Sequence, residues 1–225
     1  MIITAIKEFN YFVKNELFSA TNELEKIKSE EGRKHLQKLV YTNLVDRFDY
    51  MVDQALIENW SHESLVSDAS KSLDRPLTEA EFVSTILKEI DFKKFAENKV
   101  QEILRLTILR ERHSAKVSKL CGIFSVEKNW NEPRVNISTG KILNKITPQN
   151  KTTPYSICGY ADWLYSRRNA IVHGGGTRFL KNDIDQIKKQ FKCTIAKMVK
   201  VQLSSITVTG AFYLDLINLL SQVRE

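Results

Sequence analysis

The chain has 225 residues, of which 42% are hydrophobic and 27% charged, a composition typical of a soluble globular protein. Its length suits a single domain, or one domain that carries an insertion. No apolar run approaches the roughly 18 residues that span a bilayer, and the N-terminal residues lack a basic start and a small-residue cleavage site. We therefore expect neither a membrane span nor a secretion signal.

The cysteines indicate a reducing environment. Cys121, Cys158 and Cys193 lie far apart in the chain and do not have the spacing of metal ligands. An odd number of scattered thiols is typical of proteins that stay reduced. We expect a cytoplasmic protein that holds no metal and needs no cofactor.

The positive charge is concentrated in one segment. The formal net charge is +7, and residues 163–200 contain nine Lys or Arg against two Asp, a surplus equal to that of the whole chain. A concentrated basic surface attracts polyanions, most commonly nucleic acid. A lysine-rich, solvated helix face explains the same charge distribution equally well.

Two long amphipathic helices are predicted at the start of the chain. Apolar residues recur at steps of three and four over residues 6–27, and again over residues 36–60. Gly32 interrupts the pattern and is expected to separate the two helices.

Two further helices are predicted between residues 78 and 120. The polar stretch over residues 61–76 predicts a connection that leads to them. Thr78 and Glu81 have the spacing of a capping box and begin the first of these helices. Asp91 is placed to cap the second, whose apolar stripe extends as far as Leu120.

Residues 122–156 differ from the rest because they contain three of the four prolines. A structureless loop of this length is unusual in a compact domain, so we expect an insertion with some structure of its own, or a flap. The alternation on either side of the Thr-Gly pair 139–140 predicts a small hairpin. Trp130 in this insertion is expected to pack against the core rather than to stack on a base.

The remaining residues predict helices that complete a bundle. One begins near Ser156 and is expected to end with Gly174 in a left-handed conformation. Another follows over residues 180–198, the β-branched stretch 204–210 predicts a short strand or a turn, and the last residues predict a closing helix. The chain is thus expected to fold as a single all-α domain over residues 1–225, a helical bundle with an insertion.

The helix end within residues 160–179 carries the residue types of phosphodiester cleavage. The imidazole of His173 can accept and donate protons near neutral pH. The guanidinium of Arg168 can hold phosphate oxygens, and Asn169 can hydrogen-bond an imidazole nitrogen or a ribose hydroxyl. RNA carries its own nucleophile, the 2′-hydroxyl, so this chemistry requires no metal cluster.

Helix geometry restricts how these residues act together. Successive residues advance by about 100°, so Asn169 and His173 share a ridge, whereas Arg168 lies about 140° from His173. Both can act on one phosphate only if the last turn unwinds at the glycines, or if a second subunit supplies one of them. Arg167, Arg178 and Lys181 flank this helix end and are the predicted RNA contacts.

The stretch RNAIVH, residues 168–173, resembles the R-x4–6-H motif of the HEPN superfamily, in which a polar residue, often Asn, follows the Arg. The flanking sequence ADWLYSRRNAIVHGG is similar to the motif helix of that family. The interval from Arg167 to His173 fits the same motif, so the choice between the two arginines stays open. The resemblance is strong over this helix only; elsewhere it extends to architecture alone.

The resemblance implies an all-α bundle that acts as a metal-independent endoribonuclease, with a site formed across a homodimer. It implies Arg168, Asn169 and His173 as the catalytic set, and cleavage by 2′-hydroxyl attack that leaves a 2′,3′-cyclic phosphate and a 5′-hydroxyl. Many members are toxins or act in anti-phage defence, which implies an antitoxin or a defence-system partner protein. The RiboL-PSP-type members are the most similar.

One position departs from part of this family, and other functions stay open. Some toxin members carry a tyrosine two residues after the histidine, which an antitoxin modifies; here that position is Gly175. The alternative function is a non-catalytic helical module that binds nucleic acid or a partner protein. A third interpretation is a protein-protein scaffold that does not bind polyanions.

Overall fold

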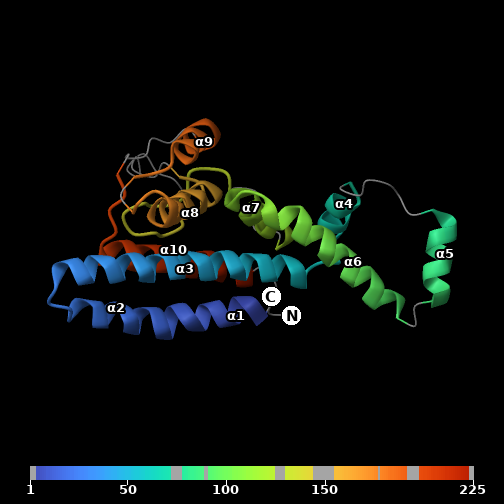
Figure 1. Cartoon of the computed structure of the whole chain (residues 1–225), viewed down its shortest axis with the longest axis horizontal. Coiled ribbons are helices and arrows are strands. Elements are labelled where there is room, and N and C mark those ends of the chain that lie inside the picture. Colours follow the sequence, from blue (N-terminus) through green and yellow to red (C-terminus); the bar gives the residue numbers. More distant parts are fainter. Residues whose placement is uncertain are drawn as a thin grey trace.

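The computed structural model confirms an all-α fold (Figure 1). The described residues form helices, and their only β-type pairings are isolated bridges. The structure describes residues 4–71, 78–88, 91–124, 130–143, 155–176, 178–191 and 198–222.

The first predicted helix is one continuous rod with an irregular middle. It consists of α1 (Thr4–Tyr11), a π-helical turn (Phe12–Leu17) and α2 (Phe18–Glu25). This rod runs antiparallel to the long helix α3 (Glu30–Glu58), as Figure 1 shows. Phe9 and Phe12 are buried on the face of the rod that packs against α3.

The break between the rod and α3 does not fall at Gly32. The side chain of Ser29 accepts a hydrogen bond from the Gly32 amide at 3.2 Å, so Ser29 is the N-cap and Gly32 lies in the first turn of α3. The capping hydroxyl therefore determines the boundary, and the glycine lies inside the helix.

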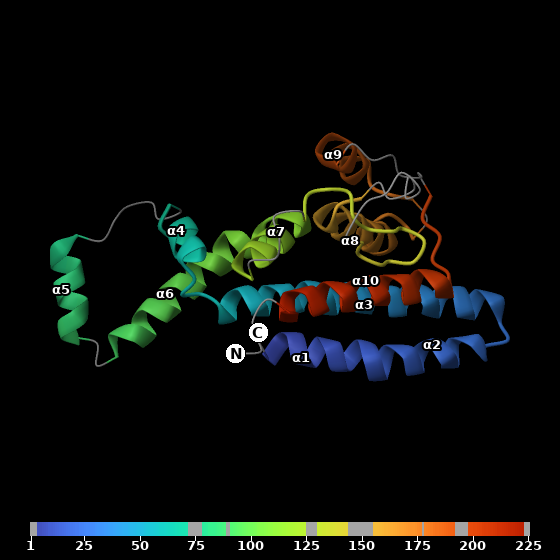
Figure 2. The ribbon, with the colours of Figure 1, turned by 180° about the vertical axis from the view of Figure 1, so that it is seen from behind.

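Helix α10 (Leu203–Gln222) packs against α1, α2 and α3 and lies in front of α3 in Figure 2. The predicted strand or turn over residues 204–210 is wrong, because these residues form the first turns of this helix. The hydroxyl of Thr209 donates to the Ser205 carbonyl at 2.7 Å, and a Cβ on Gly210 would lie 3.1 Å from the Leu17 side chain. Tertiary packing overrides the β propensity of the stretch.

Among the described residues, α10 alone has the length and the hydrophobicity of a membrane-crossing helix, with a mean hydropathy of 1.4 over residues 203–221. Its most apolar side chains, including Phe212, Tyr213 and Leu216, are buried in the bundle. The ring of Tyr213 stacks on Phe48 of α3 with centroids 3.8 Å apart. Core packing accounts for the hydrophobicity of this helix.

A second layer lies on the other side of α3. Helices α7 (His113–Ile123) and α8 (Ile157–His173) contact α3 and each other, and α9 (Lys181–Phe191) lies on α8 (Figure 1). Helix α3 is therefore buried from two sides.

An arm of shorter helices projects from the end of α3. Helix α4 (Glu63–Lys71) occupies part of the stretch that was expected to be only a connection. It contacts α6, and its Leu65 and Ala69 side chains are buried. Helix α5 (Glu79–Lys88) stands at the far end of the arm in Figures 1 and 2. Helix α6 (Phe92–Leu106) leads back to the bundle.

The predicted cap of α6 is confirmed, but the predicted length of this helix is wrong. The carboxylate of Asp91 accepts a hydrogen bond from the Lys94 amide at 3.0 Å, as expected. The helix then ends at Leu106, and a short 3-10 turn separates it from α7. The single predicted helix to Leu120 is therefore two helices.

The insertion has the expected partial structure in its described residues. Val135 pairs with Ile142 across the predicted turn, and Val135 also pairs with Tyr155 just before α8. Gly140 adopts φ 73°, where a Cβ would meet the Val208 carbonyl at 2.2 Å, so only glycine fits there.

Trp130 and two of the cysteines lie in or against the core. Trp130 packs against the core and donates to the Ser118 hydroxyl at 3.0 Å, which confirms the packing interpretation. Cys121 and Cys158 are buried free thiols, and Cys193 lies outside the described residues.

Candidate functional site

Helix α8 stays regular to its last residue. The hydroxyl of Ser156 caps its start by accepting from the Gly159 amide at 3.0 Å, and the helix continues through His173. The last turn does not unwind, so the first of the two ways in which Arg168 and His173 could meet does not occur here.

The glycines after α8 turn the chain, but in a different place from the one predicted. Gly174 has φ −94° and is not left-handed, whereas Gly175 and Gly176 have φ 66° and 75°. A Cβ on Gly174 would lie 2.4 Å from the Arg178 carbonyl and 2.7 Å from the Ala170 carbonyl. Gly174 is therefore needed for close approach, and its two successors supply the left-handed turn.

Arg168 is held in a defined position on the surface of α8. Its Nε donates to Oδ1 of Asp46 on α3 at 2.6 Å, and its NH1 donates to Oδ1 of Asn169 at 3.2 Å. The guanidinium also lies 5.9 Å from the ring centroid of Tyr165. The Arg168 side chain is 21% exposed and that of Asp46 is 46% exposed, so a phosphate can approach this ion pair from solvent.

His173 is exposed at the end of α8, one turn beyond Asn169 on the same ridge. In a regular helix the Cβ atoms of such a pair lie about 5–6 Å apart. Asn169 thus contacts Arg168 and neighbours His173, and the three residues form one polar strip. The imidazole and the guanidinium are not brought together within one chain.

Arg167 has a structural position. Its NH2 donates to the Lys200 carbonyl and to the Ser205 hydroxyl, the latter at 3.0 Å. The guanidinium also lies over the rings of Tyr41 and Trp163, 5.2 Å and 5.3 Å from their centroids. These contacts tie α8 to the start of α10, so of the two arginines Arg168 is the one available to a ligand.

The other predicted RNA contacts lie close to the glycine turn. Arg178 and Lys181 are exposed, and Arg178 forms a bridge with Met198 directly after the turn. The sequence analysis missed Lys38, whose Nζ lies 3.0 Å from the Cβ position of Gly176. Lys38 and Asp46 are two turns apart on α3, so one stripe of that helix faces the end of α8.

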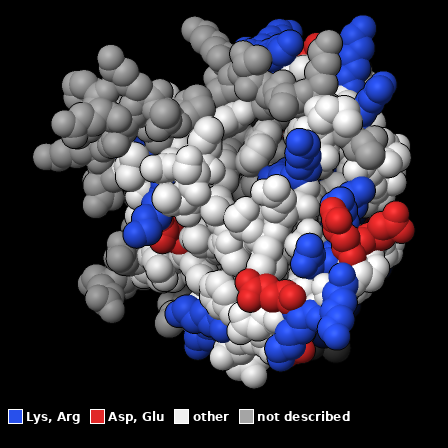
Figure 3. All heavy atoms as spheres, turned by 90° about the vertical axis from the view of Figure 1, so that its left-hand side faces the viewer, with Lys and Arg blue, Asp and Glu red and all other residues white. Residues whose placement is uncertain are grey.

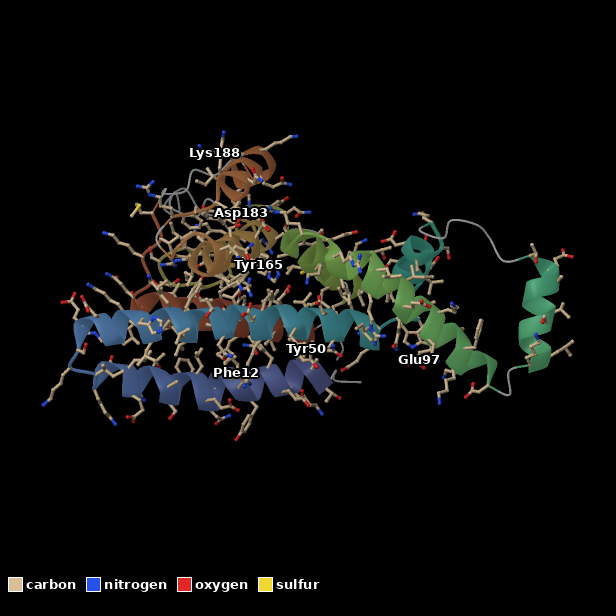
Figure 4. All side chains as sticks on the ribbon, in the orientation of Figure 1. Phe12, Tyr50, Glu97, Tyr165, Asp183 and Lys188 are labelled. Atoms are coloured by element: carbon tan, nitrogen blue, oxygen red, sulfur yellow. The ribbon has the colours of Figure 1, made fainter. Side chains whose placement is uncertain are left out.

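A buried polar cluster between α3 and α7 was also missed. Polar residues surround His113 in the sequence, but its side chain is 1% exposed, with Nδ1 2.7 Å from Oδ1 of Asp49. The His113 ring stacks on Tyr165, with centroids 4.9 Å apart and planes 3° from parallel. Lys116 lies 2.6 Å from Asp49 and 2.7 Å from Asp53. Figure 4 shows Tyr165 where α8 meets α3 and α7, so this cluster supports the helix that carries the site.

Burial and neighbouring charges set the ionisation of this cluster. Burial opposes ionisation of Asp49, but the hydrogen bond and charge of His113, with the Lys116 ammonium, outweigh it and lower the pKa of Asp49 to about 2. Burial raises the pKa of Asp53 despite the hydrogen bond from Lys116. Burial would lower the pKa of Lys116, but the two carboxylates raise it.

Arg112 fixes α9 on α8. Its Nε donates to Asp162 at 2.7 Å, its NH1 to Asp183 at 3.4 Å and its NH2 to Ser166 at 3.4 Å. Figure 4 shows Asp183 on the side of α9 that faces α8, with Lys188 pointing away from the body. Lys181, Lys188 and Lys189 of α9 are all exposed.

Within the described parts of the chain, no cluster of three or more His, Cys, Asp or Glu side chains could hold a metal ion. Comparisons with protein-family models, curated proteins and solved structures find no match to this chain.

The different positions of the two arginines predict different effects on stability. Arg167→Ala should lower the free energy of unfolding by about 1–3 kcal/mol, because it removes two ring contacts and two hydrogen bonds. Arg168→Ala should change it by less than about 1 kcal/mol, because the partner Asp46 is nearly half exposed. Urea titration of both variants measures this, and equal losses would contradict the assignment.

The lowered pKa of Asp49 predicts that the free energy of unfolding depends on pH. Its pKa is about 2 in the folded chain against 3.8 as the ordinary value, so its stabilising effect is complete above pH 4 and is lost as the pH falls towards 2. The loss should approach about 2 kcal/mol. Urea titrations between pH 2 and 6 should show a steeper decline for the natural chain than for Asp49→Asn; parallel curves would contradict this role.

Proposed function

We propose that this chain is a metal-independent endoribonuclease that acts as a homodimer. The observation that carries the proposal is the polar strip of Arg168, Asn169 and His173, with an exposed imidazole at one end and a positioned, solvent-accessible guanidinium at the other. The HEPN-type motif in the sequence points to the same three residues.

The chemistry needs a base, an acid and a clamp for the phosphate. His173 would accept the proton of a ribose 2′-hydroxyl, whose oxygen attacks the adjacent phosphorus while the bond to the 5′-oxygen breaks. The Arg168 guanidinium would stabilise the non-bridging oxygens as negative charge develops there. The products would be a 2′,3′-cyclic phosphate and a 5′-hydroxyl.

The geometry of α8 supports a site shared between two copies. Arg168 points towards α3, while His173 lies about 140° around the helix axis. Antiparallel approach of two α8 ends around a two-fold axis would place His173 of one copy opposite Arg168 of the other. Each dimer would then have two such sites, each with one imidazole and one guanidinium, and the leaving 5′-oxygen would take its proton from solvent.

Cellular RNA in the cytoplasm would be the substrate, and a role as a toxin or in anti-phage defence fits an enzyme of this chemistry. An antitoxin or defence partner would then restrain it. Gly175 stands where some toxins carry a modifiable tyrosine, so such a partner would act by another route.

One observation favours RNA binding without cleavage as the second candidate. Arg168 is already paired with Asp46, and a phosphate must compete with that carboxylate. If the pair never opens, the exposed cations Arg178 and Lys181 would still attract RNA.

His173→Ala separates these functions. The purified natural chain should cleave single-stranded or structured RNA in EDTA and release cyclic-phosphate ends, and His173→Ala should lower the rate at least about 100-fold. Its helical circular dichroism should not change, because His173 is exposed.

His35→Ala is the matched control, since His35 is also an exposed helical histidine but lies on α3. It should cleave at the rate of the natural chain. Full cleavage by His173→Ala would contradict the proposed mechanism. If the natural chain and both variants bind RNA but release no cyclic-phosphate product, RNA binding without cleavage is the function.

A further inference from the structure

One face of α3 is uncovered and carries an apolar stripe. The rod lies below α3 and α7 and α8 lie above it in Figure 1, and Figure 2 shows α10 on the rear side, so no other described helix covers the front of α3 in Figure 1. Steps of three and four residues place a set of exposed side chains along this front: Leu36, Leu39, Asn43, Asp46 and Tyr50. Leu36, Leu39 and Tyr50 are 38%, 51% and 62% exposed. Large apolar side chains that gather on a surface mark an interaction site.

A hollow of about 220 Å³ lies beside this stripe, between α3 and the rod. Arg47, Tyr50 and Met51 line it from α3, and Phe9 and Phe12 line it from the rod. Its walls are mostly apolar, so an aliphatic side chain that enters the hollow is removed from water on several sides.

The leucines of the stripe and the hollow are arranged symmetrically about Asn43. Leu36 and Tyr50 each lie seven residues from Asn43, in opposite directions along α3. A two-fold axis that passes Asn43 at right angles to α3 places Leu36 of one copy opposite Tyr50 of the other. The same axis places Leu39 opposite Arg47, so both leucines of one copy reach the hollow of the other. The two Asn43 amides would face and hydrogen-bond each other, which fixes the register of the two helices.

The charges at the edge of this face are complementary under the same axis. Asp46 and Lys38 both lie on the side of α3 towards α8, where they reach Arg168 and the Cβ position of Gly176. The axis sets Lys38 of one copy opposite residue 48 of the other, only two residues, or about 3 Å along the helix, from Asp46. An ammonium and a carboxylate thus approach each other across the contact, so charge as well as shape suits a second copy of this chain.

The end of the bundle where α2 turns into α3 is less suited to a second copy. Figure 3 views this end and shows more Lys and Arg than Asp and Glu side chains around it. Two such ends would repel each other, because their surplus charges have the same sign.

We propose that the uncovered face of α3 binds a second copy of this chain, with the two α3 helices antiparallel about Asn43, and that this contact assembles the shared site. The inference deepens the proposed function and rests on it, because it assumes that the chain acts as a homodimer. It adds which surface forms the dimer and in which register.

The same axis connects the α3 contact to the polar strip on α8. Lys38 lies at the glycine turn that follows His173, and Asp46 holds Arg168. Since Lys38 of one copy comes nearly level with Asp46 of the other, the His173 end of one α8 is brought towards Arg168 of the other. Both α8 helices then lie on the same side of the α3 pair, whereas a parallel pair would put them on opposite sides.

Leu39→Glu tests the surface. A carboxylate at this position would be buried against the apolar walls of the hollow, so dimerisation should weaken at least about tenfold, measured by sedimentation velocity. Cleavage of RNA should be lost with the dimer, while helical circular dichroism stays unchanged because Leu39 is exposed in the single chain. Leu87→Glu is the control, since Leu87 is exposed on α5 at the far end of the arm, and it should remain dimeric.

Disulfide trapping tests the register. In a Cys193→Ser background, Asn43→Cys should form a covalent dimer on mild oxidation, because each Cys lies next to its symmetry mate. Tyr50→Cys should not, because an antiparallel pair separates the two positions by 14 residues, or about 21 Å along the helix. A covalent Tyr50→Cys dimer would show a parallel pair and would overturn the proposal.

The outcomes separate this inference from the proposed function. A monomeric natural chain, or a Leu39→Glu variant that stays dimeric, overturns the interface even if His173→Ala abolishes cleavage. A monomeric Leu39→Glu that cleaves at the natural rate overturns the claim that this contact assembles the site. If Asn43→Cys is trapped and Leu39→Glu is monomeric but the natural chain does not cleave RNA, the interface stands and the proposed function fails.

Discussion

The contact between α3 and α8 determines the position of every residue in the candidate site. At its buried end, the ring of Tyr165 stacks on His113, which is held by Asp49. At its open end, Asp46 holds the guanidinium of Arg168. The buried end lies out of water, where charged and polar groups must be paired. A helix fixed in this way cannot rotate to bring a second face of α8 to the same ligand.

This rigidity is the reason to look for a second copy. The last turn of α8 is helical through His173, and Gly174 is packed against the carbonyls of Ala170 and Arg178. Local unwinding would disrupt that packing, whereas a two-fold partner requires no change within the chain. Arg167 anchors α8 to the start of α10, so the helix that carries the strip is held on the bundle.

The sequence was informative where one local interaction decides the structure. The apolar stripes predicted the long helices, and the position of Asp91 predicted the N-cap of α6. The spacing of Arg168, Asn169 and His173 placed three polar residues along α8. The sequence was insufficient where a helix is buried by neighbours on two sides. The apolar stripe of α3 concealed a polar one that contains Asp46 and Asp49. Asp46 pairs with Arg168 on α8 and Asp49 with His113 on α7, and only the fold brings these partners together. For the same reason His113 looked like a surface residue, and nothing in the spacing of residues 204–210 showed that α10 would be packed on three sides.

The most direct test of the shared site is to mix two inactive variants. Arg168→Ala and His173→Ala should each lack cleavage activity, and a mixture allowed to exchange subunits should recover roughly one quarter of the natural rate. Half of the dimers would be mixed, and each mixed dimer would have one complete site of two. Recovery of cleavage on mixing, with cyclic-phosphate products, is the predicted result. A mixture that exchanges subunits but stays inactive would contradict a site built from Arg168 of one copy and His173 of the other.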